Sequence, residues 1–378
     1  MLTVPNIYLD FNSTTPVDPL VLEAMLPWFT EKFANAASIT HKPGREVSAH
    51  VEQCRATIAD FIGCEPGEVI FTSGSTESIN MSIKGVANRY IGSGKHIITW
   101  KSEHKAVLDV CKKLQERNFE VAFLDVNREG LPDLDQYKKT LRDDTILTIM
   151  MLANNETGVI NPVREFADVA HAKKSLFLCD ATQAPGKMRV DVNELGVDML
   201  CISAHKMHGP KGVGALFVRR KNPRVALEPL LDGGGHEKGL RSGTLNVPGI
   251  VGLAAAAGLS AERYWNDTSE ISRLRTLLEQ QLTTNGKGYV NGSVKTRLPN
   301  TSNIMFPGLK ASTLLTKVPE LAIATGSACN SALPEASHVL KAMGLSDEEA
   351  YASVRFSLGR TTTEEEIEKA VQLIMKEL

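Results

Sequence analysis

The chain has 378 residues, 42% hydrophobic and 23% charged, with a formal net charge of −2. This length and composition predict a globular protein of roughly two domains, and the small net charge gives no reason to expect direct binding to nucleic acid or anionic membranes. No stretch approaches the ~18 apolar residues of a membrane span and the N-terminus lacks a signal-peptide pattern, so we expect a cytoplasmic protein.

Short apolar runs alternate with longer amphipathic stretches through the first two thirds of the chain. We predict strands at 68–72, 96–100, 120–124, 145–152, 176–179, 199–203 and 214–219, and helices at 77–90, 105–117 and 162–173. This alternation is typical of an α/β fold with a mainly parallel sheet, here of seven strands, covered by helices on both faces. Ligands of such sheets bind beyond the carboxyl ends of the strands.

The pattern changes after about residue 255. We predict a long helix at 250–283, a strand at 302–306 and two helices at 335–343 and 363–376. These elements indicate a smaller α+β domain. We expect residues 15–255 to form the large domain, and residues 1–14 and 256–378 to form the small one.

The first polar cluster follows the predicted strand 68–72, where Gly74, Ser75 and Thr76 lead into a helix. N–H groups and hydroxyls at a helix N-terminus bind anions well, although ordinary helix capping explains Ser and Thr here equally well. His104 follows the next strand. It could stack on a cofactor ring and move protons near neutral pH, or it could be a surface histidine.

Two further polar groups end apolar runs. Asn155, in Asn154-Asn-Glu-Thr-Gly158, could bond a cofactor oxygen or a carboxylate, or it could simply form a turn. Asp180 follows four apolar residues, and burying its charge is costly without a compensating cation. A protonated pyridine nitrogen would compensate it; a helix N-cap is the alternative.

Lys206 is the centre of the most informative segment, Ser203-Ala-His-Lys-Met-His-Gly-Pro. Ser203 and His205 can reach a phosphate, and the glycines that follow allow close backbone approach. A lysine, a phosphate site and a buried aspartate together suit pyridoxal phosphate (PLP), with the lysine forming an imine and the aspartate keeping the ring nitrogen protonated.

Six cysteines occur, at 54, 64, 111, 179, 201 and 329, without a Cys-x-x-Cys pair, so we expect reduced thiols and no metal site. Cys179 and Cys201 lie in apolar strands and are expected in the core. Cys329 differs because it lies in a Gly- and Ser-rich segment, about 322–335, where an exposed, mobile loop would present a reactive thiolate. Arg355 could grip a carboxylate with two hydrogen bonds or form a structural salt bridge.

Taken together, these motifs make the chain resemble the cysteine desulfurases, PLP enzymes of the aspartate-aminotransferase fold (fold type I). The resemblance covers nearly the whole chain, and Gly326-Ser-Ala-Cys329 is similar to class I, the NifS- and IscS-like members. The motifs that carry it are Tyr8–Asp18, Ser73–Glu77, Ser102–His104, Asn154–Gly158, Asp180–Gln183, Ser203–Gly212, Arg241–Thr244 and Gly326–Cys329.

The resemblance implies a role for each site residue. Lys206 would carry the cofactor and move the α-proton, His104 would stack on the ring and act in acid–base steps, and Asp180 would pair with the ring nitrogen. Gln183 and Asn155 would contact the phenolic oxygen side. Arg355 and Asn155, with Asn12 as a further candidate, would hold the substrate carboxylate. The phosphate would be held by Ser75, Thr76, Ser203 and His205, and by Thr244 of the neighbouring subunit in a homodimer.

The implied reaction converts L-cysteine to L-alanine and leaves the sulfur on Cys329 as a persulfide, for delivery to an acceptor protein in an iron–sulfur, tRNA-thiolation or DNA-phosphorothioation pathway. The alternative is another PLP lyase or aminotransferase of this fold, such as a selenocysteine lyase. The chain ends at Leu378, whereas housekeeping members carry a further C-terminal segment that docks the iron–sulfur scaffold protein. We therefore expect a specialised acceptor.

Overall fold

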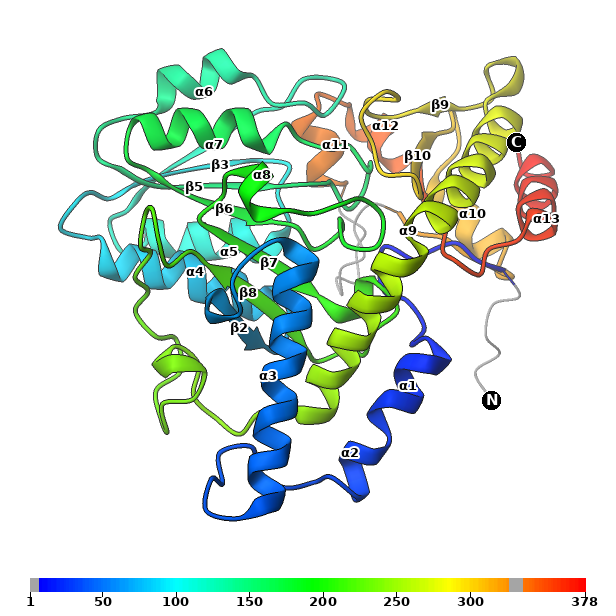
Figure 1. Ribbon diagram of the computed structural model, residues 1–378. Coiled ribbons are helices and arrows are strands. Elements are labelled where there is room, and N and C mark those ends of the chain that lie inside the picture. Colours follow the sequence, from blue (N-terminus) through cyan, green and yellow to red (C-terminus); the bar gives the residue numbers. More distant parts are fainter. Residues whose placement is uncertain (1–6, 326–335) are drawn as a thin grey trace.

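A seven-stranded sheet forms the centre of the computed structural model, which describes residues 7–325 and 336–378 (Figure 1). The strand order is β2-β8-β7-β6-β5-β3-β4. The strands are β2 (Val69–Thr72), β3 (His96–Trp100), β4 (Glu120–Leu124), β5 (Thr145–Met151), β6 (Leu176–Asp180), β7 (Met199–Ser203) and β8 (Gly214–Val218). All seven predicted strands are confirmed, with ends that differ by at most one residue.

The sheet is mainly parallel, as the sequence predicts. Strands β4, β3, β5, β6 and β7 pair in parallel, whereas β8 runs antiparallel to both of its neighbours, β7 and β2. Alternate side chains of the inner strands enter two separate apolar clusters, as expected of a sheet buried on both faces.

Helices cover both faces of this sheet. The first cluster includes side chains of α3 (Lys42–Ile62), α6 (Leu134–Thr140), α7 (Val163–Ala172) and α9 (Val247–Leu282). The second includes side chains of α4 (Ser75–Arg89) and α5 (Lys105–Gln115). Figure 1 shows α6 and α7 on one side of the sheet and α4 and α5 on the other.

Helix α3 is the longest element that the sequence analysis did not predict. The ring of His41 accepts a hydrogen bond from Gly44 N at its start, and Gly63 ends the helix in a left-handed conformation with φ 74°. The other unpredicted α-helices and strands are α6, α1 (Pro19–Met25), α2 (Pro27–Thr30), α8 (Val192–Leu195), α10 (Ala311–Lys317), α12 (Asp347–Tyr351), β1 (Ile7–Tyr8), β9 (Tyr289–Val290), β11 (Leu321–Ala322) and β12 (Ser353–Ser357).

A third apolar cluster lies at the end of α9 away from the sheet. Ile271, Leu274, Leu278 and Leu282 of α9 pack there with the strands β12-β10-β9 and helix α13 (Glu364–Met375), where β10 is Thr301–Met305. Helix α11 (His338–Ala342) is shorter than predicted. The N-terminal residues Ile7 and Leu9 belong to this third cluster, whereas Val339, Leu340 and Met343 belong to the first. The small domain of residues 1–14 and 256–378 stays a prediction.

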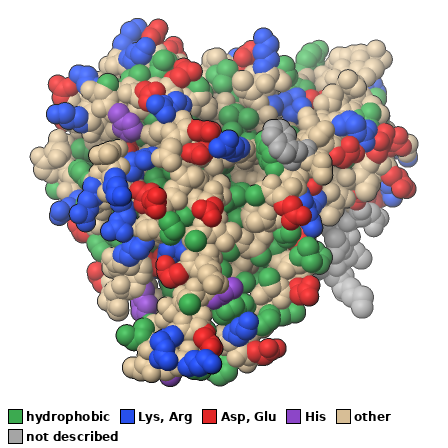
Figure 2. Space-filling model, viewed as in Figure 1, with side chains coloured by type: hydrophobic (Ala, Val, Ile, Leu, Met, Phe, Trp, Pro, Cys, Tyr) green, Lys and Arg blue, Asp and Glu red, His purple; other side chains and the backbone are tan. Residues whose placement is uncertain are grey.

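The surface has no dominant charge. On the face shown in Figure 2, basic and acidic side chains are interspersed. Within the described ranges, no helix is long and apolar enough to cross a membrane.

Candidate active site

Strands β3, β5, β6 and β7, together with β2, direct their carboxyl ends toward one cavity of about 620 Å³. This position is the one expected for a ligand of a parallel sheet, and the volume suits a cofactor with a small substrate. The cavity brings together eleven of the predicted site residues: Asn12, Ser75, Thr76, His104, Asn155, Asp180, Gln183, Ser203, His205, Lys206 and Arg355.

Lys206 follows β7 in a short 3₁₀ turn, Ala204–Lys206. Its Nζ donates to the backbone carbonyls of Asn12 at 2.6 Å and Ser13 at 2.8 Å. Burial, with a further contribution from the nearby Arg355 guanidinium, lowers the pKa of Lys206 to about 8. A substantial fraction of this amine is therefore neutral, and nucleophilic, in mildly alkaline solution.

Hydroxyls gather at the N-terminus of α4, where Ser75 and Thr76 form the first turn. Ser75 Oγ lies 2.7 Å from Thr182 Oγ1, and His205 Nδ1 lies 3.2 Å from Thr14 Oγ1. Burial and then the charge of Lys206 lower the pKa of His205 to about 4, so its ring is neutral at neutral pH. Free N–H groups and hydroxyls at a helix N-terminus suit a phosphate.

Asp180 is the buried last residue of β6. Its Oδ1 accepts from Thr182 N at 3.0 Å, from the Thr182 hydroxyl and from Cys201 Sγ at 3.4 Å. These contacts fix the direction of the carboxylate that lines the cavity. Asp180 is thus not a helix N-cap, because no helix begins after it.

His104 caps the N-terminus of α5, and its Nδ1 accepts from Ala106 N at 3.1 Å. The proton of the neutral ring is therefore on Nε2. Burial, together with the charge of Lys206 and against that of Asp180, lowers the pKa of His104. The neutral ring of His104 lines the cavity, and its Nε2–H takes no part in the capping hydrogen bond.

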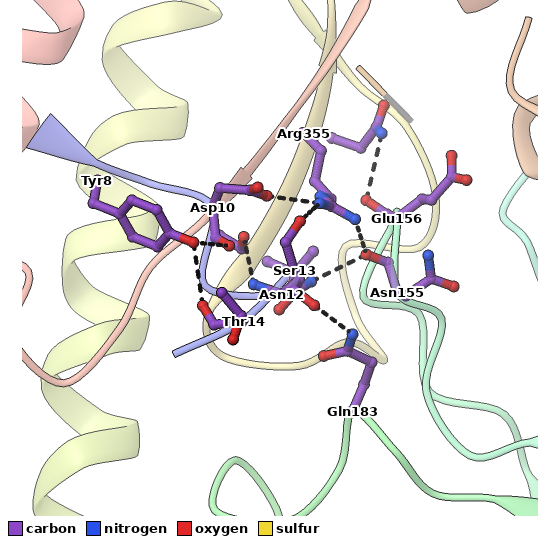
Figure 3. A network of polar contacts seen from close by, with 12 residues as sticks. Tyr8, Asp10, Asn12, Ser13, Thr14, Asn155, Glu156, Gln183 and Arg355 are labelled. Atoms are coloured by element: carbon purple, nitrogen blue, oxygen red, sulfur yellow. Dashed lines mark hydrogen bonds and ion pairs between the residues drawn. The ribbon is translucent and has the colours of Figure 1, made fainter. Parts of the chain in front are cut away.

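Arg355 reaches the cavity from β12 and is held on several sides (Figure 3). Its Nη2 donates to Asp10 Oδ1 at 2.6 Å and to Ser13 Oγ at 2.8 Å, and its Nη1 donates to Asn155 O at 3.1 Å. Nε is buried without a partner among the described residues. Asp10 and Ser13 lie inside the motif Tyr8–Asp18, but no role for them was predicted from the sequence.

Asn12 is almost fully buried, and its amide is already bonded within the protein. Nδ2 donates to Asn155 O at 3.1 Å and to Thr301 Oγ1 at 2.9 Å, while Oδ1 accepts from Asn300 Nδ2 at 3.0 Å. Gln183 Nε2 donates to Asn12 O at 3.0 Å. Asn12 therefore acts on the cavity mainly by fixing the backbone of its neighbours.

Two buried acids beside the cavity, Glu103 and Glu156, were not predicted as site residues. Glu103 is fully buried, and burial raises its pKa well above the usual range. Burial also raises the pKa of Glu156 to about 7, against the hydrogen bond from Ser337 Oγ at 2.5 Å. In Figure 3 the Glu156 carboxylate points away from Arg355. His338 Nε2 lies 2.9 Å from Glu103 O, so residues that follow the undescribed segment contact the cavity rim.

Comparison with known proteins gives a family. Residues 7–370 match the family described as Aminotransferase class-V. A relative named Cysteine desulfurase IscS, from Anaeromyxobacter dehalogenans (strain 2CP-C), is 49% identical over 97% of this chain and 91% of its own length. The chain belongs to the class-V aminotransferases, among the cysteine desulfurases. The resemblance inferred from the motifs is thereby confirmed.

Solved structures agree with this placement. A NifS-like protein superimposes with a TM-score of 0.91 at 37% identity, over 98% of both chains. A structure titled "SspA in complex with cysteine" superimposes with a TM-score of 0.83 at 34% identity, over 94% of this chain and 100% of that one.

Members of this family depend on PLP, and the cavity fits it. The amine of Lys206, the carboxylate of Asp180 and the anion site at the start of α4 all line one cavity. An aldehyde, a pyridine nitrogen and a phosphate are the three groups of PLP that need such partners.

Two predicted residues are not among those that line the cavity. Thr244 is exposed, and a residue that serves the neighbouring subunit need not line the cavity of its own chain. Cys329 lies outside the described residues.

Proposed function

We propose that this protein is a PLP-dependent cysteine desulfurase that converts L-cysteine to L-alanine and transfers the sulfur to Cys329. The observation that carries this proposal is the convergence of the Lys206 amine, the Asp180 carboxylate and the Arg355 guanidinium on one cavity. An amino-acid substrate needs a cation for its carboxylate next to the amine that carries the cofactor, and Arg355 lies there.

PLP, when bound, supplies an electron sink for the negative charge left on the substrate α-carbon. We propose that Lys206 carries it, that Asp180 pairs with its ring nitrogen, and that Gln183 and Asn155 lie on its phenolic oxygen side. Ser75, Thr76, Ser203 and His205 would hold the phosphate. His104 would stack on the ring.

The protein's own groups then act on the substrate. Arg355 and Asn155 hold the carboxylate, with Asn12 supporting Asn155, and Lys206 Nζ removes the proton from the α-carbon. The Cys329 thiolate attacks the cysteine Sγ, so that a sulfur–sulfur bond forms as the Cβ–Sγ bond breaks. His104 and Lys206 return protons to the three-carbon product, which leaves as alanine.

The functional unit we propose is a cytoplasmic homodimer in which Thr244 reaches the phosphate of the partner's cofactor. Arg241, three residues earlier, donates to Glu77 Oε1 at 2.9 Å and so connects this segment to the first turn of α4. The persulfide would pass to an acceptor protein of a sulfur-transfer pathway. Sedimentation of the purified protein tests the dimer.

The decisive experiment measures alanine and sulfide release from L-cysteine by the purified protein and its Cys329→Ala variant. We expect the variant to keep the visible absorbance of bound PLP and to lose sulfide and persulfide formation. Cys64→Ala is a matched control, because Cys64 lies outside the cavity and burial raises its pKa to about 12. Undiminished turnover by Cys329→Ala would refute the role of Cys329. A keto-acid product would instead indicate an aminotransferase.

A further inference from the structure

A second lysine, Lys187, lies next to the proposed cofactor site, in contact with Gln183. It lines a small separate cavity of about 30 Å³, which Lys206 also lines, and it is not among the residues that line the large cavity. Its Nζ donates to Gln183 Oε1 at 2.8 Å and, more weakly, to Asn12 Oδ1 at 3.4 Å. Both acceptors are neutral amide oxygens, so these contacts do not neutralise the ammonium.

The contact with Gln183 decides how its carboxamide is oriented. A carboxamide can present either its oxygen or its NH₂ group. The N–H groups of Lys187 donate to it, and the ammonium form, which prevails below pH ~7, offers only donors and therefore requires the oxygen. With Oε1 turned toward Lys187, Nε2 is turned toward Asn12 O, at 3.0 Å. The same carbonyl accepts from Lys206 Nζ at 2.6 Å. The NH₂ group of Gln183 and the amine of Lys206 thus meet at one oxygen.

The electrostatic surroundings of Lys187 are cationic. Burial, followed by the charges of Lys206 and Arg355, lowers the pKa of Lys187 to about 7. Two nearby histidines, His205 and His208, have pKa values lowered to about 4 mainly by burial, and Lys187 contributes to both shifts. A lysine kept in such a place at an energetic cost needs a compensating role.

We propose that Lys187 is a positioning residue that fixes the carboxamide of Gln183 with its NH₂ group toward Lys206 and the cofactor. The inference rests on the proposed cofactor site and deepens it. Without the ammonium, the Gln183 carboxamide is free to turn its own oxygen toward the cofactor. The phenolic oxygen of the cofactor then loses a hydrogen-bond donor, and the negative charge on that oxygen is destabilised.

The test follows the visible absorbance of bound PLP as a function of pH, which reports on the cofactor rather than on turnover. In Lys187→Met we expect the midpoint of the absorbance change to rise by about one pH unit, the size expected for one lost hydrogen bond to a charged group. Lys187→Arg, which keeps a cation, should restore the original midpoint. Lys139→Met, at an exposed lysine of α6, is the control for loss of a lysine elsewhere.

A second background separates an effect through Gln183 from a direct one. If Lys187 acts through the carboxamide, Lys187→Met should no longer shift the midpoint in a protein that already carries Gln183→Leu. An equal shift in both backgrounds, or none in either, overturns the proposal. If Lys187→Met does not take up PLP, Lys187→Gln is measured in its place. If no variant takes up PLP, Lys187→Arg included, Lys187 is needed for packing, and this result also overturns the proposal.

The outcome stays separate from that of the proposed function. Alanine and sulfide release by the unsubstituted protein tests the reaction, whereas the absorbance titration tests only the orientation of Gln183.

Discussion

Lys206 is the residue whose protonation state is most directly measurable. Only a neutral amine adds to an aldehyde, and the pKa of Lys206 is lowered to about 8, mainly by burial. The rate at which cofactor-free protein takes up PLP should therefore rise with pH and level off above about pH 8. With an ordinary lysine, the rate of PLP uptake would level off only above pH ~10.4. Rapid mixing with PLP, followed by visible absorbance, measures this rate.

Arg355→Gln provides the matched variant for this titration. Removing the guanidinium removes the second cause of the lowered pKa, so the midpoint should move upward. A midpoint near that of a free lysine in the unsubstituted protein would contradict the burial argument.

Glu156 makes a different pH-dependent contribution, this time to stability. Its pKa is about 7 in the folded protein and about 4.3 in an unfolded chain. Between these values the folded state holds a proton that the unfolded state has lost, so the free energy of unfolding falls as pH rises through this window. Glu156→Gln removes this loss and should be stabilised relative to the parent by about 3 kcal/mol more at pH ~8 than at pH ~4.

Urea unfolding at the two pH values measures this difference, with the exposed Glu129→Gln as control. The glutamine oxygen can still accept from Ser337, so the hydrogen bond itself is retained. An equal effect of Glu156→Gln at both pH values would mean that Glu156 stays ionised in the folded protein.

The residues predicted from the sequence and those missed differ in a physical way. Lys206, Asp180 and His104 stand in ordered motifs beside strand ends, and the structure brings them to one cavity. Lys187 and Glu156 stand in or beside the same motifs. Their burial comes from segments far away in the chain, such as Ser337 for Glu156. No local pattern reports such burial.

At the scale of elements, the reversed strand β8 matters for the cofactor site because Gly214, its first residue, packs against Gly74 at the start of α4. A Cβ on Gly214 would lie 2.5 Å from Ile202 O and 2.8 Å from Gly74 Cα. Both are backbone atoms, so the phosphate-binding turn would have to move. We expect Gly214→Ala to destabilise the fold by about 1–3 kcal/mol and to weaken PLP retention.

The contrasting variant is Gly258→Ala in the exposed middle of α9, where an added Cβ meets no atom within 4 Å. It should be stabilising by up to about 1 kcal/mol. Thermal unfolding and PLP retention after gel filtration measure both variants. Full PLP retention by Gly214→Ala would show that the turn tolerates the displacement.

Elements with strong periodicity were predictable, whereas those that depend on distant partners were not. The strands of the central sheet are mostly apolar runs, and all seven were predicted. Strand β12 was missed although Ser353-Val-Arg-Phe-Ser357 alternates as a strand does. Its polar residues are buried by pairing with β10 and at the cavity, which the local sequence does not show. Helix α3 was missed because its first turn contains Pro43 and Gly44, which make the helical spacing of its apolar residues harder to recognise.

At the scale of the whole molecule, one buried ion pair joins α3 and β2 to the segment that carries Thr244. Arg55 donates to both carboxylate oxygens of Glu237 at 2.8 Å, and one of these oxygens also accepts from Phe71 N at 2.7 Å. Arg55→Met leaves the Glu237 charge buried and unpaired, which should cost about 3–5 kcal/mol.

The double variant Arg55→Met with Glu237→Gln separates charge from packing. It leaves no ion behind and keeps an acceptor for Phe71 N, so it should be less destabilised than Arg55→Met alone. Urea unfolding measures this difference. If the double variant is the less stable of the two, the cost of Arg55→Met lies in lost packing over Phe71 rather than in the stranded carboxylate.

The salt bridge between Asp10 and Arg355 spans 345 positions of the chain. During synthesis, Asp10, Asn12 and Ser13 leave the ribosome long before Arg355. The Arg355 contacts that order this corner therefore cannot form on the nascent chain until β12 has emerged. The sheet can collapse earlier, around contacts that are closer in sequence. Stable capture of PLP therefore has to wait until β12 has emerged, so the availability of PLP matters only after that stage of synthesis.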